Sequence, residues 1–186
     1  MERTLVLIKP DGVARAIIGR VVSRFEDAGL KVVALKMLTP SKKMAEAHYP
    51  MEKQWYENLW NNTKKSYDSK GEEFTETPVQ TGRRVRNMLI KHITSGPVVA
   101  MVIEGNESVD IVRKICGATS PSRADPSTIR GSLASDSYSL ADASKRSVKN
   151  IVHASDSARS AQREISVWFS SDEINGYARA DEPALY

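Results

Sequence analysis

The residue best placed for chemistry in this sequence is His153, which ends a short β-branched run among small polar residues, Asn150-Ile151-Val152-His153-Ala154-Ser155. Neutral imidazole is nucleophilic near neutral pH, so a histidine at the end of a strand can be a reactive group. The period of two in a strand places Ile151 and His153 on one face. Asp156 and Ser157 are good helix N-caps, so a helix is expected to follow directly.

On that helix, Glu164 lies seven residues after Ser157 and on the same side as Ser160. A return from strand to helix would bring the Glu164 carboxylate back towards His153. The alternative is a structural histidine capped by Ser155, which is the commoner role of a histidine without other context.

Three cations could hold phosphate groups: Lys9, Arg113 and Arg130, each within or directly after an expected ordered element. Converging ammonium and guanidinium groups would neutralise a diphosphate and a transferring phosphoryl group. Thr119 and Asn150 could add neutral hydrogen bonds. The sequence has no Walker loop ending in GK[ST] and no protein-kinase glycine loop with HRD, so side chains would have to bind the phosphates. Taken singly, Arg113 is more often a helix-surface residue and Arg130 a turn-stabilising one.

Five motifs give these residues a common context, and in their order along the chain they resemble the nucleoside diphosphate kinase family. They extend over most of residues 2–169 and read Ile8-Lys9-Pro10-Asp11-Gly12, Ile93-Thr94-Ser95-Gly96-Pro97-Val98-Val99-Ala100-Met101-Val102, Gly117-Ala118-Thr119-Ser120-Pro121, Thr128-Ile129-Arg130-Gly131 and the His153 segment.

The resemblance implies a ping-pong transfer, in which neutral His153 attacks the γ-phosphate of a nucleoside triphosphate and the phosphohistidine then passes the group to a nucleoside diphosphate. Glu164 would fix the tautomer of His153, Ser155 would orient Glu164, and Tyr49 would sit beside the histidine. The family motif places its functional residues at Lys9, Tyr49, Arg113, Thr119, Arg130, Asn150, His153, Ser155 and Glu164.

The resemblance also implies Mg²⁺ that bridges the nucleotide phosphates, and the sequence has no clustered carboxylates that would form a protein cage for the metal. A homo-oligomer is expected, either a tetramer or a hexamer built from dimers. The competing interpretation is a non-catalytic member of the family that keeps the fold and the nucleotide pocket as a binding or scaffolding module.

Some positions depart from the family pattern. The aromatic residue expected to stack on the nucleotide base falls near Trp55 and Tyr56, where an insertion makes the alignment uncertain. Ser127 replaces a glycine, and Ser132 and Leu133 stand where the family usually has Asp-Phe. These last changes concern the loop and subunit packing more than the phosphates.

Hydrophobic periodicity predicts the elements that must position these residues. Strands are expected at 3–8, 31–38, 97–103 and 150–154, and helices at 17–28, 41–48, 108–116 and 157–169, with a polar helical segment between the second and third strands. The pattern is βαββαβ, an α+β ferredoxin-like sandwich in which two helices cover one face of an antiparallel sheet.

The chain is expected to be a single domain over residues 1–186, with three additions. These are a helical insertion at about 50–92, an extended loop at about 132–149 and a peripheral tail at 170–186. Lys9-Pro10-Asp11-Gly12 is expected to form a turn.

Composition is consistent with a cytoplasmic enzyme. The 186 residues are 40% hydrophobic, the single cysteine, Cys116, excludes an internal disulfide framework, and no apolar run approaches the roughly 18 residues of a membrane helix. The net charge of +4 fits a phosphate pocket or a weak attraction to polyanions. The basic cluster Arg83-Arg84-Val85-Arg86 is interpreted as the solvated face of an amphipathic helix, and the sequence has no dedicated nucleic-acid motif.

Overall fold

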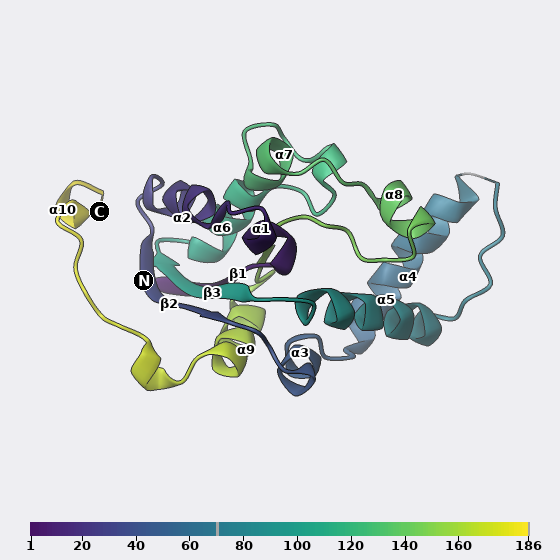
Figure 1. Ribbon diagram of the computed structural model, residues 1–186, viewed down its shortest axis with the longest axis horizontal. Coiled ribbons are helices and arrows are strands. Elements are labelled where there is room, and N and C mark those ends of the chain that lie inside the picture. Colours follow the sequence, from purple (N-terminus) through teal and green to yellow (C-terminus); the bar gives the residue numbers. More distant parts are fainter. Residues whose placement is uncertain (70, 186) are drawn as a thin grey trace.

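A four-stranded antiparallel sheet with strand order β2-β3-β1-β4 forms the centre of the computed structural model, which describes residues 1–69 and 71–185 (Figure 1). The strands are β1 (Glu2–Ile8), β2 (Lys31–Leu38), β3 (Val98–Gly105) and β4 (Val152–Ala154). Lys70 of the predicted insertion and Tyr186 of the predicted tail lie outside the described residues. The α+β ferredoxin-like fold expected from the βαββαβ pattern is confirmed.

The two central strands, β3 and β1, are buried on both faces along their apolar runs, residues 98–103 and 5–8. On one face, Val6 and Ile8 of β1 pack with Val21 and Phe25 of α2 (Ile18–Glu26) and with Val112 of α6 (Ser108–Cys116). These are the two helices that the apolar stripes of the sequence predict for one face of the sheet.

The opposite face of the sheet is covered as well, because Leu5 and Leu7 of β1 point to that side. They pack with Trp168 of α9 (Ala158–Trp168), Ala45 of α3 (Lys42–His48) and Ile93 of α5 (Pro78–Ile93). Figure 1 shows α9 and α3 on the side of the sheet away from α2 and α6. This second layer brings the end of α3 and the side of α9 next to β4.

A hairpin of two helices, α4 (Lys53–Asp68) and α5, occupies the predicted insertion and extends away from the sheet (Figure 1). Thr77 and Gln80 form a reciprocal capping box at the start of α5. The indole Nε1 of Trp60 donates to the carbonyl of Glu76 at 2.6 Å, and this contact ties the middle of α4 to the start of α5.

The basic cluster on α5 is used within the fold. Arg84 forms an ion pair with Glu76 at 2.7 Å. Arg86 donates from Nε to the carbonyl of Tyr49 at 2.5 Å and from Nη2 to the carbonyl of Glu46 at 3.0 Å. These carbonyls belong to the C-terminal turn of α3, where no further residue of the helix can supply a donor. Of this cluster only Arg83 is exposed. The interpretation of the cluster as a solvated helix face therefore holds for Arg83 and is wrong for Arg86, which is part-buried against the end of α3.

Two further segments are ordered by hydrogen bonds. The predicted loop at 132–149 contains α8 (Tyr138–Ala143) and is held at Asp136, whose carboxylate accepts from Arg146 at 2.6 and 3.0 Å and from the backbone of Lys149 at 2.7 Å. The tail follows the free edge of β2, since the amide of Asn175 donates to the carbonyl of Val33 at 2.8 Å. The remaining short elements are η1 (Pro121–Arg123), α7 (Ile129–Leu133), η2 (Ser171–Glu173) and α10 (Glu182–Leu185).

Most predicted boundaries agree with the structure to within two residues, and two differences have a physical cause. The predicted turn after Lys9 is instead a short helix, α1 (Pro10–Ala14), with proline at its first position, where the missing N–H costs nothing. The last strand begins at Val152 rather than at 150, because Ile151 has a positive φ of 68° and cannot continue a strand. Among the described residues, no helix is long and apolar enough to span a membrane.

We predict that Arg86→Ala lowers the free energy of unfolding by about 2 kcal/mol, because two charge-assisted hydrogen bonds to the end of α3 are lost. Arg83→Ala, three residues away on the same helix, is the matched control and should change it by less than about 0.5 kcal/mol. Urea unfolding measures both. Equal effects of the two substitutions would show that Arg86 does not hold α3.

Candidate active site

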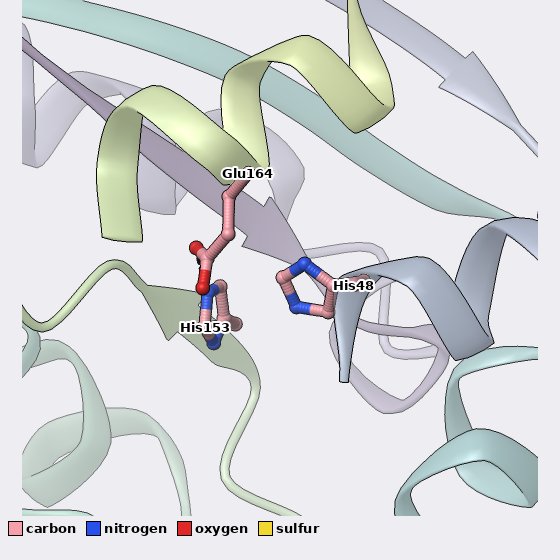
Figure 2. A group of neighbouring side chains, drawn as sticks. All are labelled: His48, His153 and Glu164. Carbon is pink, nitrogen blue, oxygen red and sulfur yellow. Dashed lines mark hydrogen bonds and ion pairs between the residues drawn. The ribbon is translucent and has the colours of Figure 1, made fainter. Parts of the chain in front are cut away.

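His153 is held from β4 by a carboxylate and a serine. Its Nε2 lies 2.7 Å from Oε2 of Glu164, and the hydroxyl of Ser155 donates to the same oxygen, also at 2.7 Å. Ser157 caps α9, as predicted, by accepting from the amide of Ser160 at 3.2 Å. The strand-to-helix return therefore brings Glu164 back to His153, as expected from the sequence (Figure 2).

The ionisation of Glu164 determines which ring nitrogen of His153 carries the proton. Burial raises the pKa of Glu164. The charge and hydrogen bond of His153 and the Ser155 hydroxyl together lower it by more, so the pKa is about 2. The carboxylate is therefore ionised at neutral pH and can only accept hydrogen bonds. Nε2 of His153 must be the donor, so Nδ1 of the neutral ring carries the lone pair. The side chain of His153 remains 22% exposed, which leaves it accessible to a reactant.

A tight turn at Ile151 precedes His153. The amide of Val152 donates to the carbonyl of Asn150 at 2.7 Å, which with a φ of 68° at Ile151 makes a γ-turn of the strained kind. Ile151 and Val152 both pack into the core beneath α2 and α6. The expectation that Ile151 and His153 share one face is therefore wrong, because the turn replaces the strand alternation on which it depended.

Asp11 holds this turn in place. Its Oδ2 accepts from the amide of Ile151 at 2.9 Å, and its Oδ1 lies 3.0 Å from Nε2 of His92 at the end of α5. The amide of Lys9 donates to the carbonyl of Ile151 at 2.7 Å. A Cβ on Gly12 would lie 2.8 Å from a methyl carbon of Ile8 and 3.0 Å from one of Ile151, so only glycine lets the turn approach α1 this closely.

Lys9 and Asn150 are joined directly, since the Lys9 ammonium donates to Oδ1 of Asn150. The amide nitrogen of Asn150 donates in turn to the carbonyl of Thr119 at 2.7 Å, which fixes the orientation of the Asn150 side chain. Burial lowers the pKa of Lys9 to about 8, with Asp11 opposing the shift and Arg130 adding to it. Thr119 is exposed, unlike Lys9 and Asn150, which are buried.

Arg130 lies beside the strand that carries His153. It is 9% exposed and donates from Nη2 to the carbonyl of Val152 at 2.9 Å and from Nη1 to the carbonyl of Gly117. Gly117 has a φ of 82°, and a Cβ there would lie 2.3 Å from the hydroxyl of Thr128, so this bend requires glycine. Burial lowers the pKa of Arg130, and the charge of Arg113 lowers it as well, which places the exposed Arg113 within electrostatic range.

These three cations share one property. Among the described residues, no carboxylate lies within 4.0 Å of Lys9, Arg113 or Arg130. Two of them are buried, where an unpaired charge is costly. The site therefore has positive charge without a direct carboxylate partner, which an anionic ligand would neutralise.

The predicted aromatic residues lie at different distances from this centre. Tyr49 contacts His48 with ring centroids 4.5 Å apart, and His48 contacts His153, also at 4.5 Å. Trp55 and Tyr56 lie in the first turn of α4, both half-buried, and Tyr56 packs against Gly82 of α5. Among the residues that the structure describes, neither Trp55 nor Tyr56 forms a hydrogen bond or ring contact with His153, and their stacking on a base stays a prediction.

Sequence reasoning missed three residues that support the site: Asp11, His48 and His92. Asp11 stands inside one of the quoted motifs, so its position was available, but its role depends on a turn that the sequence does not predict. His48 and His92 approach the site from α3 and α5, and contacts between such distant segments leave no local pattern.

Metal ligands are limited in kind. Within the described part of the chain, the one group of histidine, cysteine and acidic side chains close enough to share an ion is His48, His153 and Glu164, with ligand atoms within 4.8 Å of one another. Mg²⁺ prefers a shell of oxygen ligands, which this nitrogen-rich group does not offer. This group is therefore not a site of the kind that Mg²⁺ prefers.

An α+β ferredoxin-like fold with a carboxylate-oriented histidine beside unpaired cations defines a class of proteins that bind phosphate groups next to a nucleophile. The sequence profile described as nucleoside diphosphate kinase matches residues 2–68 and 77–174. A nucleoside diphosphate kinase from Pyrobaculum aerophilum is 46% identical over 179 residues, covering 94% of this chain and 98% of the relative. The chain belongs to the nucleoside diphosphate kinase family.

Solved structures agree with this assignment. The crystal structure of an NDP kinase from Pyrobaculum aerophilum superposes with a TM-score of 0.90 at 44% identity, covering 94% of this chain and 99% of that one. A nucleoside-diphosphate kinase from Borrelia burgdorferi, described as a transition state mimic with bound vanadate and ADP, gives a TM-score of 0.80 at 40% identity, covering 98% and 95% of the two chains.

We predict that Asp11→Asn destabilises the protein at pH 7. Burial raises the pKa of Asp11. The hydrogen bond with His92, the charge of Lys9 and the Ile151 amide together lower it by more, so the pKa is about 2. Because this pKa lies below that of the unfolded chain, the carboxylate contributes about 2 kcal/mol above pH 4, and the contribution is lost as pH falls through 2.

Urea unfolding between pH 7 and pH 2 measures this contribution. The Asp11→Asn variant should converge with the wild type at the acid end, whereas the exposed Asp68→Asn control should follow the wild type within about 0.5 kcal/mol throughout. A constant offset of Asp11→Asn at every pH would mean that the loss comes from packing and not from charge.

Proposed function

We propose that this protein transfers the γ-phosphate of a nucleoside triphosphate to a nucleoside diphosphate by a ping-pong mechanism, with His153 as the phosphoryl carrier. The observation that carries the proposal is the position of an imidazole with a free Nδ1 lone pair, oriented by an ionised carboxylate, beside three cations without carboxylate partners. Membership of the nucleoside diphosphate kinase family supports the same reaction.

In the first half-reaction, the Nδ1 lone pair of His153 attacks the γ-phosphorus. The bond between this phosphorus and the β–γ bridging oxygen breaks, and the nucleoside diphosphate leaves with that electron pair. Nε2–H stays on the ring throughout and donates to Glu164, which stabilises the positive charge that develops on the imidazole. Ser155 holds Glu164 in this position. The second half-reaction is the reverse transfer to a second diphosphate, so a single site serves both.

Lys9, Arg113 and Arg130 stabilise the negative charge on the phosphates during transfer. Because Lys9 and Arg130 are already desolvated and fixed by hydrogen bonds to Asn150, Gly117 and Val152, little reorganisation is needed when the charge moves. Thr119 and Asn150 add neutral hydrogen bonds to the phosphates or the ribose.

Mg²⁺ brought by the nucleotide would be held mainly by the nucleotide phosphates, where it would neutralise charge on the diphosphate. The nucleotide base stacks on an aromatic residue at the pocket mouth, for which Trp55 and Tyr56 are the candidates. The vanadate and ADP bound by the Borrelia burgdorferi relative support a site of this kind for nucleotide and transferring phosphoryl group.

We further infer that the protein is cytoplasmic and acts as a homo-oligomer, a tetramer or a hexamer of dimers. Family membership supports the assembly.

We predict that Arg113→Ala and Arg130→Ala each reduce kcat/KM by at least about 10²-fold, because each removes charge-assisted contacts that strengthen in the transition state. The exposed Lys114, next to Arg113 on α6, provides the control, and Lys114→Ala should retain kcat/KM within about twofold of the wild type. Steady-state phosphate exchange between ATP and a second diphosphate measures all three. Near-normal kinetics for both arginine variants would show that these residues do not bind the phosphates.

The carrier itself is tested by labelling. Incubation with γ-labelled ATP should produce a phosphohistidine that is labile in acid and stable in alkali, and His153→Ala should abolish it. His92→Ala removes a different histidine and should retain the label. The Glu164→Gln variant should label more slowly, while its affinity for ADP stays close to that of the wild type. Label that persists in His153→Ala, or that survives acid and is lost in alkali, would reject His153 as the carrier.

A further inference from the structure

His48, the last residue of α3, is buried against His153. The two ring centroids are 4.5 Å apart and the ring planes meet at 82°, an edge-to-face contact. His48 is 1% exposed, so its ring is shielded from solvent. Figure 2 shows the two ring nitrogens of His48 directed to different sides, one towards helix α9 and the other on the side of His153.

The protonation of His48 is determined by Trp168. The indole Nε1–H of Trp168 donates to Nδ1 of His48 at 3.2 Å. An indole nitrogen can only donate, so Nδ1 must accept and the neutral ring of His48 carries its proton on Nε2. This Nε2 is buried and has no hydrogen-bond partner among the described residues. A buried N–H without a partner costs free energy, so its retention needs a cause.

We propose that His48 is a positioning residue for the phosphoryl carrier, which holds its Nε2–H edge against the face of the His153 ring while Trp168 fixes the tautomer. This proposal rests on the function proposed above, because it takes His153 as the nucleophile. An N–H that points to an aromatic face is a weak but favourable contact, and it fixes the plane of the ring that it meets.

The contact matters because His48 and Glu164 have opposite effects on the protonation of the His153 ring. A carboxylate beside an imidazole favours the protonated, positively charged ring, and a protonated ring has no lone pair with which to attack phosphorus. The positive end of the His48 N–H dipole disfavours charge on the same ring. Glu164 thus fixes which nitrogen is free, and His48 helps to keep that nitrogen unprotonated.

His48, Tyr49 and Glu164, which surround the contact, do not change their protonation state over the pH range of the measurement. Burial lowers the pKa of His48 to about 3, with the charge of His153 acting in the same direction, so His48 stays neutral. Burial raises the pKa of Tyr49, which also stays neutral. Glu164 and Arg163 from α9 are the charged groups that face His48. Below the pKa of about 8 of Lys9, these groups and the Lys9 ammonium therefore keep the same charge.

Two arginines hold the backbone that carries His48. Arg163 of α9 donates from Nη1 to the carbonyls of Ala47 and His48, both at 3.3 Å, and Arg86 of α5 donates to those of Glu46 and Tyr49. The last carbonyls of α3 are thus bound from two different helices. His48 is therefore held at its backbone by the two arginines and at the Nδ1 of its ring by Trp168.

The alternative role for these side chains is a metal site formed by His48, His153 and Glu164. A metal would bind the lone pair of a His48 nitrogen on the His153 side, so the ring proton would move to Nδ1. Nδ1–H would then face the N–H of Trp168, and two donors would oppose each other. Metal-bound histidines instead donate from their second nitrogen to an acceptor. The structure favours the positioning role.

Three variants test this role. His48→Phe keeps a ring but removes the N–H, whereas His48→Gln keeps an N–H near the position of Nε2. Trp168→Phe removes the indole donor that fixes the tautomer of His48. Single-turnover labelling with γ-labelled ATP is measured from pH 5 to pH 7.5, below the pKa of about 8 of Lys9, and ADP affinity is measured separately. We expect His48→Phe to label about tenfold more slowly at pH 7 and to reach its half-maximal rate at a higher pH than the wild type. The ADP affinity of His48→Phe should stay within about twofold of that of the wild type. His48→Gln should recover most of the labelling rate, and the rate of Trp168→Phe should lie between those of His48→Phe and the wild type.

Nitrogen NMR of the wild-type protein provides a second measurement that does not depend on the variants folding. It should show the Nε2–H tautomer of His48 at pH 7 and at pH 5. An Nδ1–H tautomer, or titration of Zn²⁺ alone that shows binding lost in His48→Gln, would overturn the proposal in favour of a metal site. A wild-type rate and pH profile in a folded His48→Phe variant would overturn it as well.

The proposal and the function on which it rests fail in different ways. If the wild-type protein takes no label on His153, the proposed function is wrong whatever the variants do. If the wild type is labelled on His153 and the His48 variants match it, only the positioning role is rejected.

Discussion

The γ-turn at Ile151 is the constraint on which the site depends. A β-branched residue with positive φ is unfavourable, and the fold keeps it there through the Asp11 carboxylate, the Lys9 amide and the space left by Gly12. The turn reverses the chain within one residue, so that Asn150 reaches Lys9 on one side while His153 reaches Glu164 on the other. A regular strand from 150 to 154 would place these side chains on alternating faces set by the pleat alone.

The carboxylates and the cations of the site have different roles. Buried carboxylates orient other groups: Glu164 binds His153 and Ser155, and Asp11 binds His92 and the Ile151 amide. Lys9, Arg113 and Arg130, in contrast, have no carboxylate within 4.0 Å among the described residues. This separation leaves positive charge available for the phosphate contacts proposed above, and it keeps the carboxylates ionised where they hold His153 and the Ile151 turn.

Much of this arrangement could be predicted from the sequence because it is local or lies in compact motifs. The apolar runs predict the strands, the stripes of α2 and α6 predict the layer that covers one face, and the spacing from Ser157 to Glu164 predicts the return to His153. The face of Ile151 was predicted wrongly, since the strand period carries no information about a γ-turn stabilised by Asp11, which lies 140 residues away. The contact of His48 with His153 joins α3 to β4 and depends on Trp168, Arg86 and Arg163, so it follows only from the packed structure.

The central claim is that one histidine accepts a phosphoryl group and passes it on without leaving the site. The most direct test is to label the wild-type protein with γ-labelled ATP, remove all nucleotide, and then add GDP, CDP or UDP in separate reactions. The site described here predicts that the label moves completely to each diphosphate in the absence of ATP, because Lys9, Arg113 and Arg130 bind phosphates and not the base. Label that stays on the protein, or that transfers only while ATP is present, would contradict a covalent carrier at His153.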